Sequence, residues 1–234
     1  NYAETWLKLD DAAGTTTYAD FSGNLPARTA TCTVAQCPGT TLGVSGQAAS
    51  FDGNDDKLTL NLPQTINGSF TVAAWVKPNI TSGNLAIAGS RINDHNLFDF
   101  KLRNGNQVHG DIGDGTKWLT TAADATLNYV AGNWYHIAYV VTPQSYTIYV
   151  NGVQKATGTY ATSTPLLTDA AHRLLVGNSG NGEPMNGVID DVRVFARALR
   201  SDEVAALTVL PVLKLNFDSG QTQFIDASGQ GNNA

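Results

Sequence analysis

The chain has 234 residues, of which 42% are hydrophobic and only 15% are charged, and its formal net charge is −6. It contains no apolar stretch of about 18 residues, which excludes a membrane-spanning helix, and its negative charge without any basic run argues against nucleic acid or an anionic membrane as a partner. Its 23 glycines, together with many threonines and asparagines, predict an all-β protein with short strands and many turns, and single β-sandwich domains reach about 200 residues.

The first chemically distinctive motif is Asp20-x-Ser22-Gly23, which Asn24 follows. It combines a hard carboxylate with a glycine-bearing turn that can aim backbone carbonyls at one point, and Ca²⁺ prefers such oxygen ligands. The alternative is an Asx-turn, in which Asp20 bonds the following backbone without any metal. Both interpretations are open at the level of sequence.

The two cysteines, Cys32 and Cys37, stand in the stretch TCTVAQCPG. Neither has a histidine or a further cysteine at the spacing of a zinc site. We predict a disulfide between them, which implies an oxidising compartment, and the alternative is a pair of free thiols in a surface loop. Asn1 is not an initiator residue, so we expect that a signal peptide or earlier domains have been removed.

The acidic stretch DGNDD, residues 52–56, looks like a calcium loop but lacks the spacing and the distal glutamate of one. We therefore predict a hairpin turn there. In residues 69–78 every second residue is apolar, which predicts a strand, and residues 134–141 alternate in the same way. Asn151-Gly152 separates two strand-like runs and predicts a tight β-hairpin.

The segment 90–118 is rich in arginine, asparagine, aspartate and histidine and ends on a tryptophan. Sugar sites combine an aromatic platform with planar polar groups, so we predict a ligand site here if the strands bring these residues together. The alternative is a tryptophan in the core and a simple turn at residues 113–115. The predicted ligand-binding residues are Arg91, Asn93, His95, Asp99 and Trp118.

Two adjacent carboxylates, Asp190 and Asp191, stand in the last strand-like run, GVIDDVRVFAR. Strict alternation puts Asp190 on one face with three valines, where an unpaired carboxylate is costly. A bound cation would remove that cost, and a hydrogen-bonded Asp190 is the alternative. Asp191 falls on the other face with Arg193, where an ordinary ion pair suffices. The next residues, 198–207, are helical in pattern, with Ser201 as a candidate N-cap.

Residues 213–229 repeat the pattern of residues 7–23, with eight identities in seventeen ungapped positions and the Asp-x-Ser-Gly motif in register. Two strands that merely share a pattern would not produce this match. We therefore predict one domain over residues 1–209 and the truncated beginning of a second repeat over residues 210–234.

Five stretches in order resemble laminin-G-like domains of the concanavalin A-like superfamily: FDGNDDKLTL, SFTVAAWVKP, GNWYHIAYVV, YTIYVNGVQ and LLVGNSGNGEPMNGVIDDVRVFARALRSDEV. The resemblance covers nearly all of residues 3–208. It implies a jelly-roll β-sandwich of two curved antiparallel sheets with one short C-terminal helix. It also implies a secreted or cell-surface protein, in which such domains often occur in tandem.

The resemblance further implies a structural calcium ion between the N-terminal Asp-x-Ser-Gly loop and the aspartate of the late strand. Transferred to this sequence, the ligands would be Asp20 and Asp190, with backbone carbonyls from the Asn24 region. Calcium is therefore the predicted cofactor.

Catalytic motifs are sparse, although relatives of this fold include glycoside hydrolases. These enzymes use two carboxylates, often as Glu-x-Asp-x-x-Glu on one strand, and the chain has no such run. Asp99 has no paired carboxylate on its own strand, and no serine stands in a Gly-x-Ser-x-Gly turn. We predict that the protein is not an enzyme, although carboxylates from distant strands could still form a pair.

The leading hypothesis for function is a non-catalytic glycan-binding module of an extracellular repeat protein. A protein-binding module of a cell-surface array is the main alternative, because linked weak sites gain avidity. A spacer without a ligand and a hydrolase are the remaining alternatives. The predicted partners are a glycan or an extracellular protein, and neighbouring repeats of the same chain.

Overall fold

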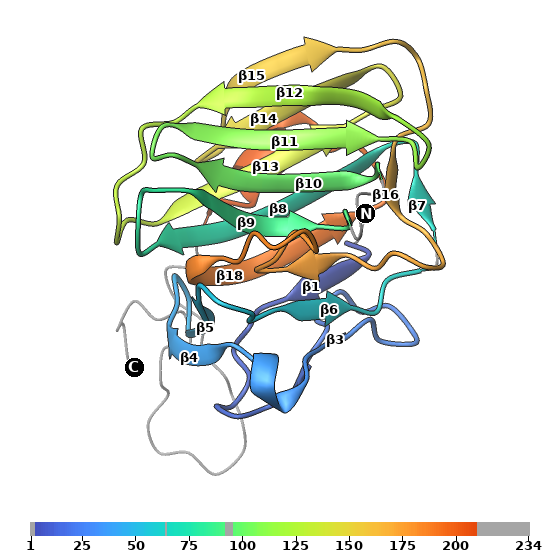
Figure 1. Cartoon of the computed structure of the whole chain (residues 1–234). Helices are drawn as coiled ribbons and strands as arrows, with labels where there is room; N and C mark the ends of the chain where they lie inside the picture. Colours follow the sequence, from blue (N-terminus) through green and yellow to red (C-terminus); the bar gives the residue numbers. More distant parts are fainter. Residues whose placement is uncertain (1–2, 64, 92–95, 210–234) are drawn as a thin grey trace.

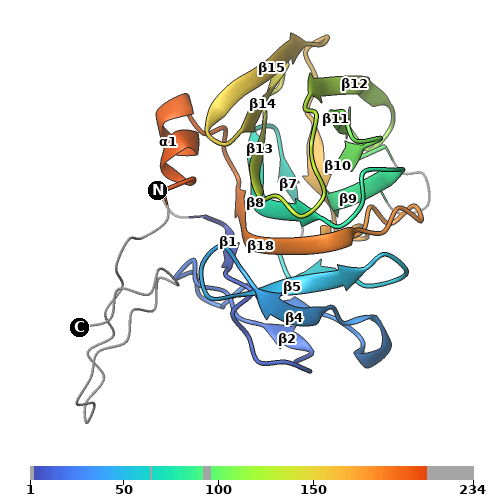
Figure 2. The ribbon, with the colours of Figure 1, turned by 90° about the vertical axis from the view of Figure 1, so that its left-hand side faces the viewer.

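The computed structural model describes residues 3–63, 65–91 and 96–209. Within these residues almost all regular structure is β, in two large antiparallel sheets with one short α-helix outside them (Figures 1 and 2). The predicted all-β sandwich is therefore confirmed. Asn93 and His95, and the predicted second repeat, lie outside the described residues.

The first sheet, sheet A, has a spatial order that differs from the order of its strands in the chain. Its neighbouring strands are β15 (Val153–Thr159), β14 (Ser145–Val150), β13 (Tyr135–Val141), β8 (Phe70–Pro78), β18 (Asn186–Phe195), β5 (Gln47–Asp52) and β4 (Gly39–Leu42), and β1 (Thr5–Leu7) also pairs with β18.

The second sheet, sheet B, faces the viewer in Figure 1. Its neighbouring strands are β12 (Trp118–Thr126), β11 (Gln107–Gly113), β10 (Phe98–Arg103), β9 (Asn84–Gly89), β17 (Leu175–Val176), β6 (Leu58–Leu60), β3 (Ala30–Thr31) and β2 (Thr17–Tyr18). A small separate pair joins β16 (Leu166–Thr168) and β7 (Ile66–Asn67).

The core lies between the two sheets and is centred on aromatic rings. Phe98 of β10 packs edge-to-face against Phe70 of β8 and Tyr139 of β13, with ring centroids 5.2 and 5.5 Å apart, and all three side chains are fully buried. Aromatic pairs in this geometry add about 0.5–1.5 kcal/mol each to the burial of their area. The alternation predicted for residues 69–78 therefore gives the correct inward face.

The short helix α1 (Ser201–Ala206) covers part of the outer face of sheet A (Figure 2). Its buried Val204 belongs to a second apolar cluster with residues of β8, β13, β14 and β18. The helix begins with Arg200 as N-cap rather than the predicted Ser201. The Arg200 backbone N–H donates instead to the Glu203 carboxylate at 2.9 Å.

Of two predicted hairpin turns, one is confirmed and the other is wrong. Asn151 and Gly152 have positive φ of 50° and 76° and join β14 to β15, so the predicted tight hairpin is confirmed. The acidic stretch 52–56 was predicted to be a hairpin turn, but it joins β5 of sheet A to β6 of sheet B. It is a crossing between sheets, because its flanking strands pair with other partners.

The late strand β18 contains a bulge that the sequence pattern did not reveal. Asp191 has a positive φ of 50°, and the register with β8 shifts between Asp190 and Arg193. The extra residue reverses the alternation, so Ile189 and Val192 both face the core. Asp190 therefore lies on the outer face of sheet A, and the prediction that it shares a face with Val192 is wrong.

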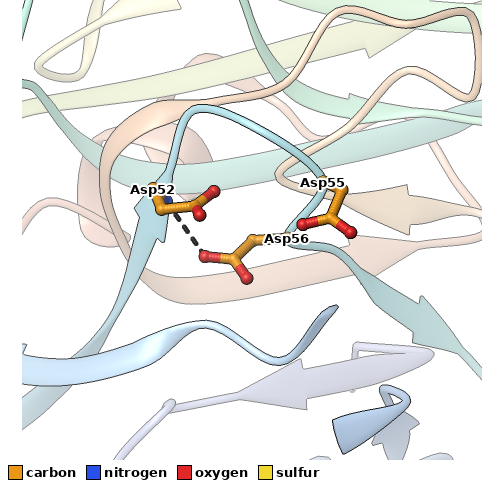
Figure 3. A group of neighbouring side chains, drawn as sticks. All are labelled: Asp52, Asp55 and Asp56. Atoms are coloured by element: carbon orange, nitrogen blue, oxygen red, sulfur yellow. Dashed lines mark hydrogen bonds between the residues drawn. The ribbon is translucent and has the colours of Figure 1, made fainter. Parts of the chain in front are cut away.

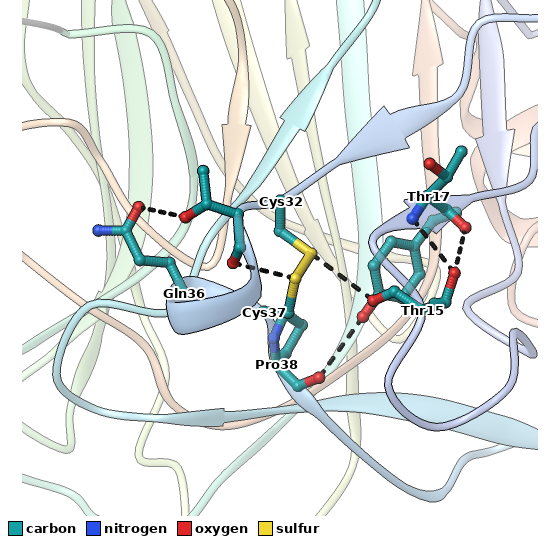
Figure 4. The surroundings of a disulfide bond; sticks show 8 residues. Thr15, Thr17, Cys32, Gln36, Cys37 and Pro38 are labelled. Atoms are coloured by element: carbon teal, nitrogen blue, oxygen red, sulfur yellow. Dashed lines mark hydrogen bonds between the residues drawn. A yellow bond between two sulfur atoms is a disulfide. The ribbon is translucent and has the colours of Figure 1, made fainter.

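The disulfide between Cys32 and Cys37 is present, as predicted (Figure 4). It closes a loop that contains the single turn of 3₁₀-helix η1 (Val34–Gln36). Cys32 also packs against the main core, so the bond anchors this exposed loop to the sandwich.

Candidate functional site

Charged side chains occupy the outer face of sheet B, where β10 and β11 lie side by side. Because successive residues of a strand point to opposite faces, the core residues of β10 alternate with Asp99 and Lys101. The antiparallel register places Asp111 of β11 opposite Asp99, and His109 opposite Lys101. Four ionisable groups therefore meet on one face.

One half of this cluster is an ion pair network around Lys101. Its ammonium lies 3.1 Å from the Asp99 carboxylate and 2.5 Å from the carboxylate of Glu183, which comes from the loop before β18. Asn84 of β9 donates a further hydrogen bond to Glu183 at 2.7 Å. Lys101 is only 3% exposed and Asp99 is fully buried, so water screens these charges weakly.

The other half is organised around Asp111. Arg91 lies 3.4 Å from Asp111 and 3.9 Å from Asp99, so one guanidinium bridges the two opposing carboxylates. His109 lies 3.4 Å from Asp111 through Nε2 and 2.5 Å from Asp124 of β12 through Nδ1. We call the resulting set the charged row; it comprises Glu183, Lys101, Asp99, Arg91, Asp111, His109 and Asp124.

The surroundings of the charged row shift the pKa values of its two opposing carboxylates, Asp99 and Asp111, in opposite directions. Burial raises the pKa of Asp99 to about 6, although the charge of Lys101 opposes this shift. Burial also acts on Asp111, but the hydrogen bond and charge of His109 outweigh it and lower the pKa of Asp111. Burial opposes the charged form of His109, yet Asp111 and Asp124 together raise its pKa.

Three predicted ligand residues come together at one end of the charged row. Trp118 begins β12 opposite Gly113, and the Arg91 guanidinium lies 5.0 Å from the centre of its indole ring. The same guanidinium contacts Asp99, which is fully buried. Trp118 is half-buried and does not belong to the core, contrary to the alternative interpretation. The side chains of Arg91 and Trp118 are thus partly exposed, and the buried carboxylate of Asp99 contacts the Arg91 guanidinium.

A polar pocket of about 460 Å³ lies at the opposite end of β10, β11 and β12. We call it the amide pocket, because four of its side chains end in amides. It is lined by Arg103, Asn104, Asn106, Gln107, Thr126 and Asn128. None of these residues was predicted to bind a ligand.

The remaining three of the four tryptophans lie on the outer face of sheet A. Arg193 lies 4.4 Å from the ring centre of Trp6, and Lys77 lies 5.0 Å from that of Trp134. Trp75 packs edge-to-face against His136. Trp134 with Lys77 therefore repeats, on the other sheet, the geometry of Trp118 with Arg91.

The predicted calcium ligand Asp20 is fully engaged by hydrogen bonds. Its Oδ1 accepts the backbone N–H groups of Trp6 and Ser22, and its Oδ2 accepts the Arg28 N–H and the Ser22 hydroxyl, all within 2.8–2.9 Å. Burial raises its pKa, but these bonds outweigh that effect and lower it. The Asn24 amide donates to neighbouring carbonyls. These hydrogen bonds are those of the Asx-turn alternative.

Asp190 is also held by the backbone. Its Oδ2 accepts the Val44 N–H at 2.8 Å and its Oδ1 accepts the Asp191 N–H at 2.7 Å. Burial nevertheless raises the pKa of Asp190 to about 7. Asp191 pairs with Arg193 at 2.9 Å. Asp190 therefore lies on the outer face of sheet A, where backbone N–H groups bond its carboxylate, and not among core valines. It does not need a cation to offset an apolar environment.

A different acidic group has the geometry to hold a metal ion. Asp52, Asp55 and Asp56, at the crossing between β5 and β6, each place one carboxylate oxygen within 4.8 Å of the others (Figure 3). Among the described residues, this is the one group of three or more acidic, histidine or cysteine side chains that does so. Asp56 is buried, and its carboxylate accepts the Asp52 N–H at 2.9 Å.

A laminin-G-type family model, described as the concanavalin A-like lectin/glucanases superfamily, matches residues 52–205. No sequence among curated proteins matches the chain. No helix of the described residues is long and apolar enough to cross a membrane.

Several solved structures share the fold. Domain 4 of AbnA, an extracellular arabinanase from Geobacillus stearothermophilus in complex with arabinotriose, has a TM-score of 0.66 at 22% identity, over 89% of this chain and all of that one. The ligand-binding domain of botulinum neurotoxin serotype D, in complex with N-acetylneuraminic acid, has a TM-score of 0.63 at 15% identity, over 88% of this chain and 50% of that one. Trypanosoma rangeli sialidase scores 0.61 at 14% identity, over 87% of this chain and 32% of that one.

Proposed function

Because the chain belongs to the concanavalin A-like lectin/glucanase superfamily, we propose that it is a non-catalytic carbohydrate-binding module of an extracellular multidomain protein. The fold alone does not determine function, so the proposal depends on the site. Two solved structures of the same fold, the arabinanase domain and the neurotoxin domain, were determined in complex with sugars, which supports this class of ligand.

The observation that carries the proposal is the pairing of Arg91 with Trp118. An indole ring offers an apolar face to the C–H groups of a sugar, and a guanidinium offers planar donors to its hydroxyls. Here Asp99 and Asp111 fix the guanidinium 5.0 Å from the ring, so both groups are oriented before a ligand arrives. Preorganisation of this kind lowers the cost of binding.

The opposing carboxylates Asp99 and Asp111 favour a supporting role over catalysis. Their pKa values are shifted in opposite directions, as in an acid and base pair. However, Asp99 is fully buried and Asp111 is only 4% exposed, so neither can reach a glycosidic bond in this conformation. We infer that the pair orients Arg91.

The disulfide supports secretion or display at the cell surface, because such bonds persist in oxidising compartments. We further propose that residues 1–209 form one module and that residues 210–234 begin the next. The alternative of a protein-binding module is favoured by one feature, the three partly exposed tryptophans on the outer face of sheet A.

Trp118→Ala is expected to weaken binding of a neutral glycan about tenfold or more, because it removes the aromatic platform and the surface against which Arg91 stacks. Its melting temperature is expected to stay within a few degrees of the wild type, since Trp118 lies outside the core. A glycan array would identify a ligand, and calorimetry would measure its affinity for each variant.

Trp134→Ala is the matched control, because it also removes a half-buried tryptophan with a cation 5.0 Å from its ring, but on sheet A. This variant should bind the glycan normally. Loss of binding in Trp134→Ala with retention in Trp118→Ala would place the site on sheet A and refute the assignment.

A structural calcium ion is the second part of the proposal, with Asp52, Asp55 and Asp56 as its best-placed ligands. Calcium at 100 times its Kd would stabilise the fold by about 2.7 kcal/mol. Asp55→Asn should abolish this calcium-dependent rise in melting temperature, because it removes an exposed carboxylate of the group. The exposed Asp202→Asn is the control. Identical melting curves in calcium and in chelator, with no calcium by elemental analysis, would rule the ion out.

A further inference from the structure

The amide pocket is built on a hairpin tip whose backbone is fixed from several sides. Asn104 and Gly105 have positive φ of 50° and 74°, as the two central residues of a type I′ turn require, and Asn106 completes the three-residue connection between Arg103 and Gln107. The Asn104 N–H donates to the Gly83 carbonyl at 2.9 Å, and the next two carbonyls of the tip accept the N–H groups of Tyr129 and Leu127 at 3.0 and 2.9 Å. The side chains of the tip are therefore carried on a preorganised backbone.

The pocket presents hydrogen-bonding groups that the protein itself does not use. Within the described part of the chain, the amides of Asn104, Asn106 and Asn128 form no side-chain hydrogen bond with the protein. Gln107 donates through Nε2 to Asp124 at 2.8 Å, which leaves its carbonyl oxygen as an acceptor. Each amide offers both a donor and an acceptor, as a sugar hydroxyl does.

The amide pocket differs in charge from the site formed by Arg91 and Trp118, which we call the Arg91 site. Arg103 is its one charged side chain, and the six lining residues include no carboxylate although the chain as a whole carries a net charge of −6. Arg91 is neutralised by Asp99 and Asp111, whereas Arg103 forms no ion pair with any residue that the structure describes. Asp124 of the charged row, which accepts a hydrogen bond from the lining residue Gln107, is also bonded to His109.

From these features we propose that the amide pocket is a second carbohydrate subsite, and that it takes a sugar unit bearing a carboxylate. A guanidinium without a partner binds a carboxylate through two parallel hydrogen bonds, and the surrounding amides bind the hydroxyls. The volume of about 460 Å³ suits a small ligand, since such sites span roughly 300–1,000 Å³. The inference rests on the proposed carbohydrate-binding function and specifies a further site and ligand class for it.

The test titrates the full chain with 3′-sialyllactose, with a glucuronic acid disaccharide and with neutral lactose. Calorimetry gives affinities, and the asparagine side-chain resonances in a ¹⁵N correlation spectrum report the pocket directly. At least one acidic sugar should bind about tenfold or more tightly than lactose, and its affinity should fall as salt is added. The two acidic ligands separate a sialic acid from a uronic acid as the preferred unit.

Single substitutions test which residues bind the acidic sugar. Arg103→Gln should lose about tenfold or more in affinity for the acidic sugar and leave lactose unchanged, whereas Lys155→Gln removes the same charge from an exposed position of β15 and should change neither. Asn104→Gly keeps a turn that glycine tolerates and should weaken both sugars. Trp118→Ala should retain the acidic sugar.

The outcomes separate this proposal from the previous one. Equal binding of acidic and neutral sugars, unaffected by Arg103→Gln, overturns the acidic subsite. If Trp118→Ala then still abolishes binding of a neutral glycan, the carbohydrate-binding function stands without the subsite. If instead the acidic sugar binds at the pocket and Trp118→Ala affects no glycan, the amide pocket is upheld and the Arg91 site is refuted.

Discussion

Lys101→Met is expected to lower the free energy of unfolding by about 3–5 kcal/mol, which is the usual cost of breaking a buried ion pair on one side. Methionine replaces the aliphatic stem of Lys101 but leaves the carboxylates of Asp99 and Glu183 without their shared cation. The Asp99 side chain is fully buried and that of Glu183 is only 18% exposed, so water compensates poorly for the lost charge. Urea denaturation at pH 8 measures the change.

Three comparisons control this prediction. Lys155→Met, on an exposed part of β15, should change stability by less than about 0.5 kcal/mol. The double variant Lys101→Met, Asp99→Asn should recover part of the loss, because one uncompensated charge is removed with its partner. Simple additivity of the two single changes would contradict the coupling.

The loss should also shrink as the pH falls. The pKa of Asp99 is raised in the folded state, mainly by burial, so its contribution to stability is fully present below its unfolded pKa and is lost as the pH rises through about 6. Without Lys101 this carboxyl gains still more from protonation. Lys101→Met should therefore be less destabilised at pH 5 than at pH 8, and a loss that does not vary with pH would count against a buried carboxylate.

Gly177→Ala is expected to cost about 2–5 kcal/mol. Gly177 follows β17 with a positive φ of 78°, a conformation that costs an L-residue about 1–2 kcal/mol. A Cβ atom there would also lie 2.0 Å from the ring of Phe51, which is 1% exposed in the core, and such overpacking adds about 1–3 kcal/mol. Thermal and urea unfolding of the variant would measure the total.

Gly68→Ala is the matched control for Gly177→Ala. Its φ is 76°, but an added Cβ would meet no heavy atom within 4 Å. It should therefore show the backbone cost of about 1–2 kcal/mol alone. Equal losses in the two variants would mean that the core beside Phe51 relaxes around the methyl group.

Local alternation predicted the sheets wherever the strands are regular. Phe70, Val72, Ala74 and Val76 all face the core, as the period of two requires. The same reasoning failed in β18, because one residue in the left-handed conformation, Asp191, reverses the pattern after it. A bulge depends on the fit between neighbouring strands, and a single strand carries no signal for it.

Only part of the candidate site could be predicted from the sequence, because the site also depends on how neighbouring strands pair. Composition alone indicated Arg91, Asp99 and Trp118, and the structure brings these three together. Lys101 and Asp111 were missed, although each alternates with core residues in its strand and could have been assigned to the outer face. Their importance arises from the register of β10 with β11, which joins residues distant in sequence. The amide pocket likewise depends on the β10–β11 tip lying beside the end of β12.

The pairing of β1 with β18 has a consequence for biosynthesis. Thr5 lies opposite Val194, and β18 also separates β5 from β8, so the centre of sheet A is made of the last strand among the described residues. Hairpins such as β10–β11 and β14–β15 can form early because their strands adjoin in sequence. The N-terminal residues, however, have no place in the sheet until residue 195 has left the ribosome. The nascent domain would therefore wait as an open sandwich with an unfilled central position, a state in which pairing with another chain is most hazardous.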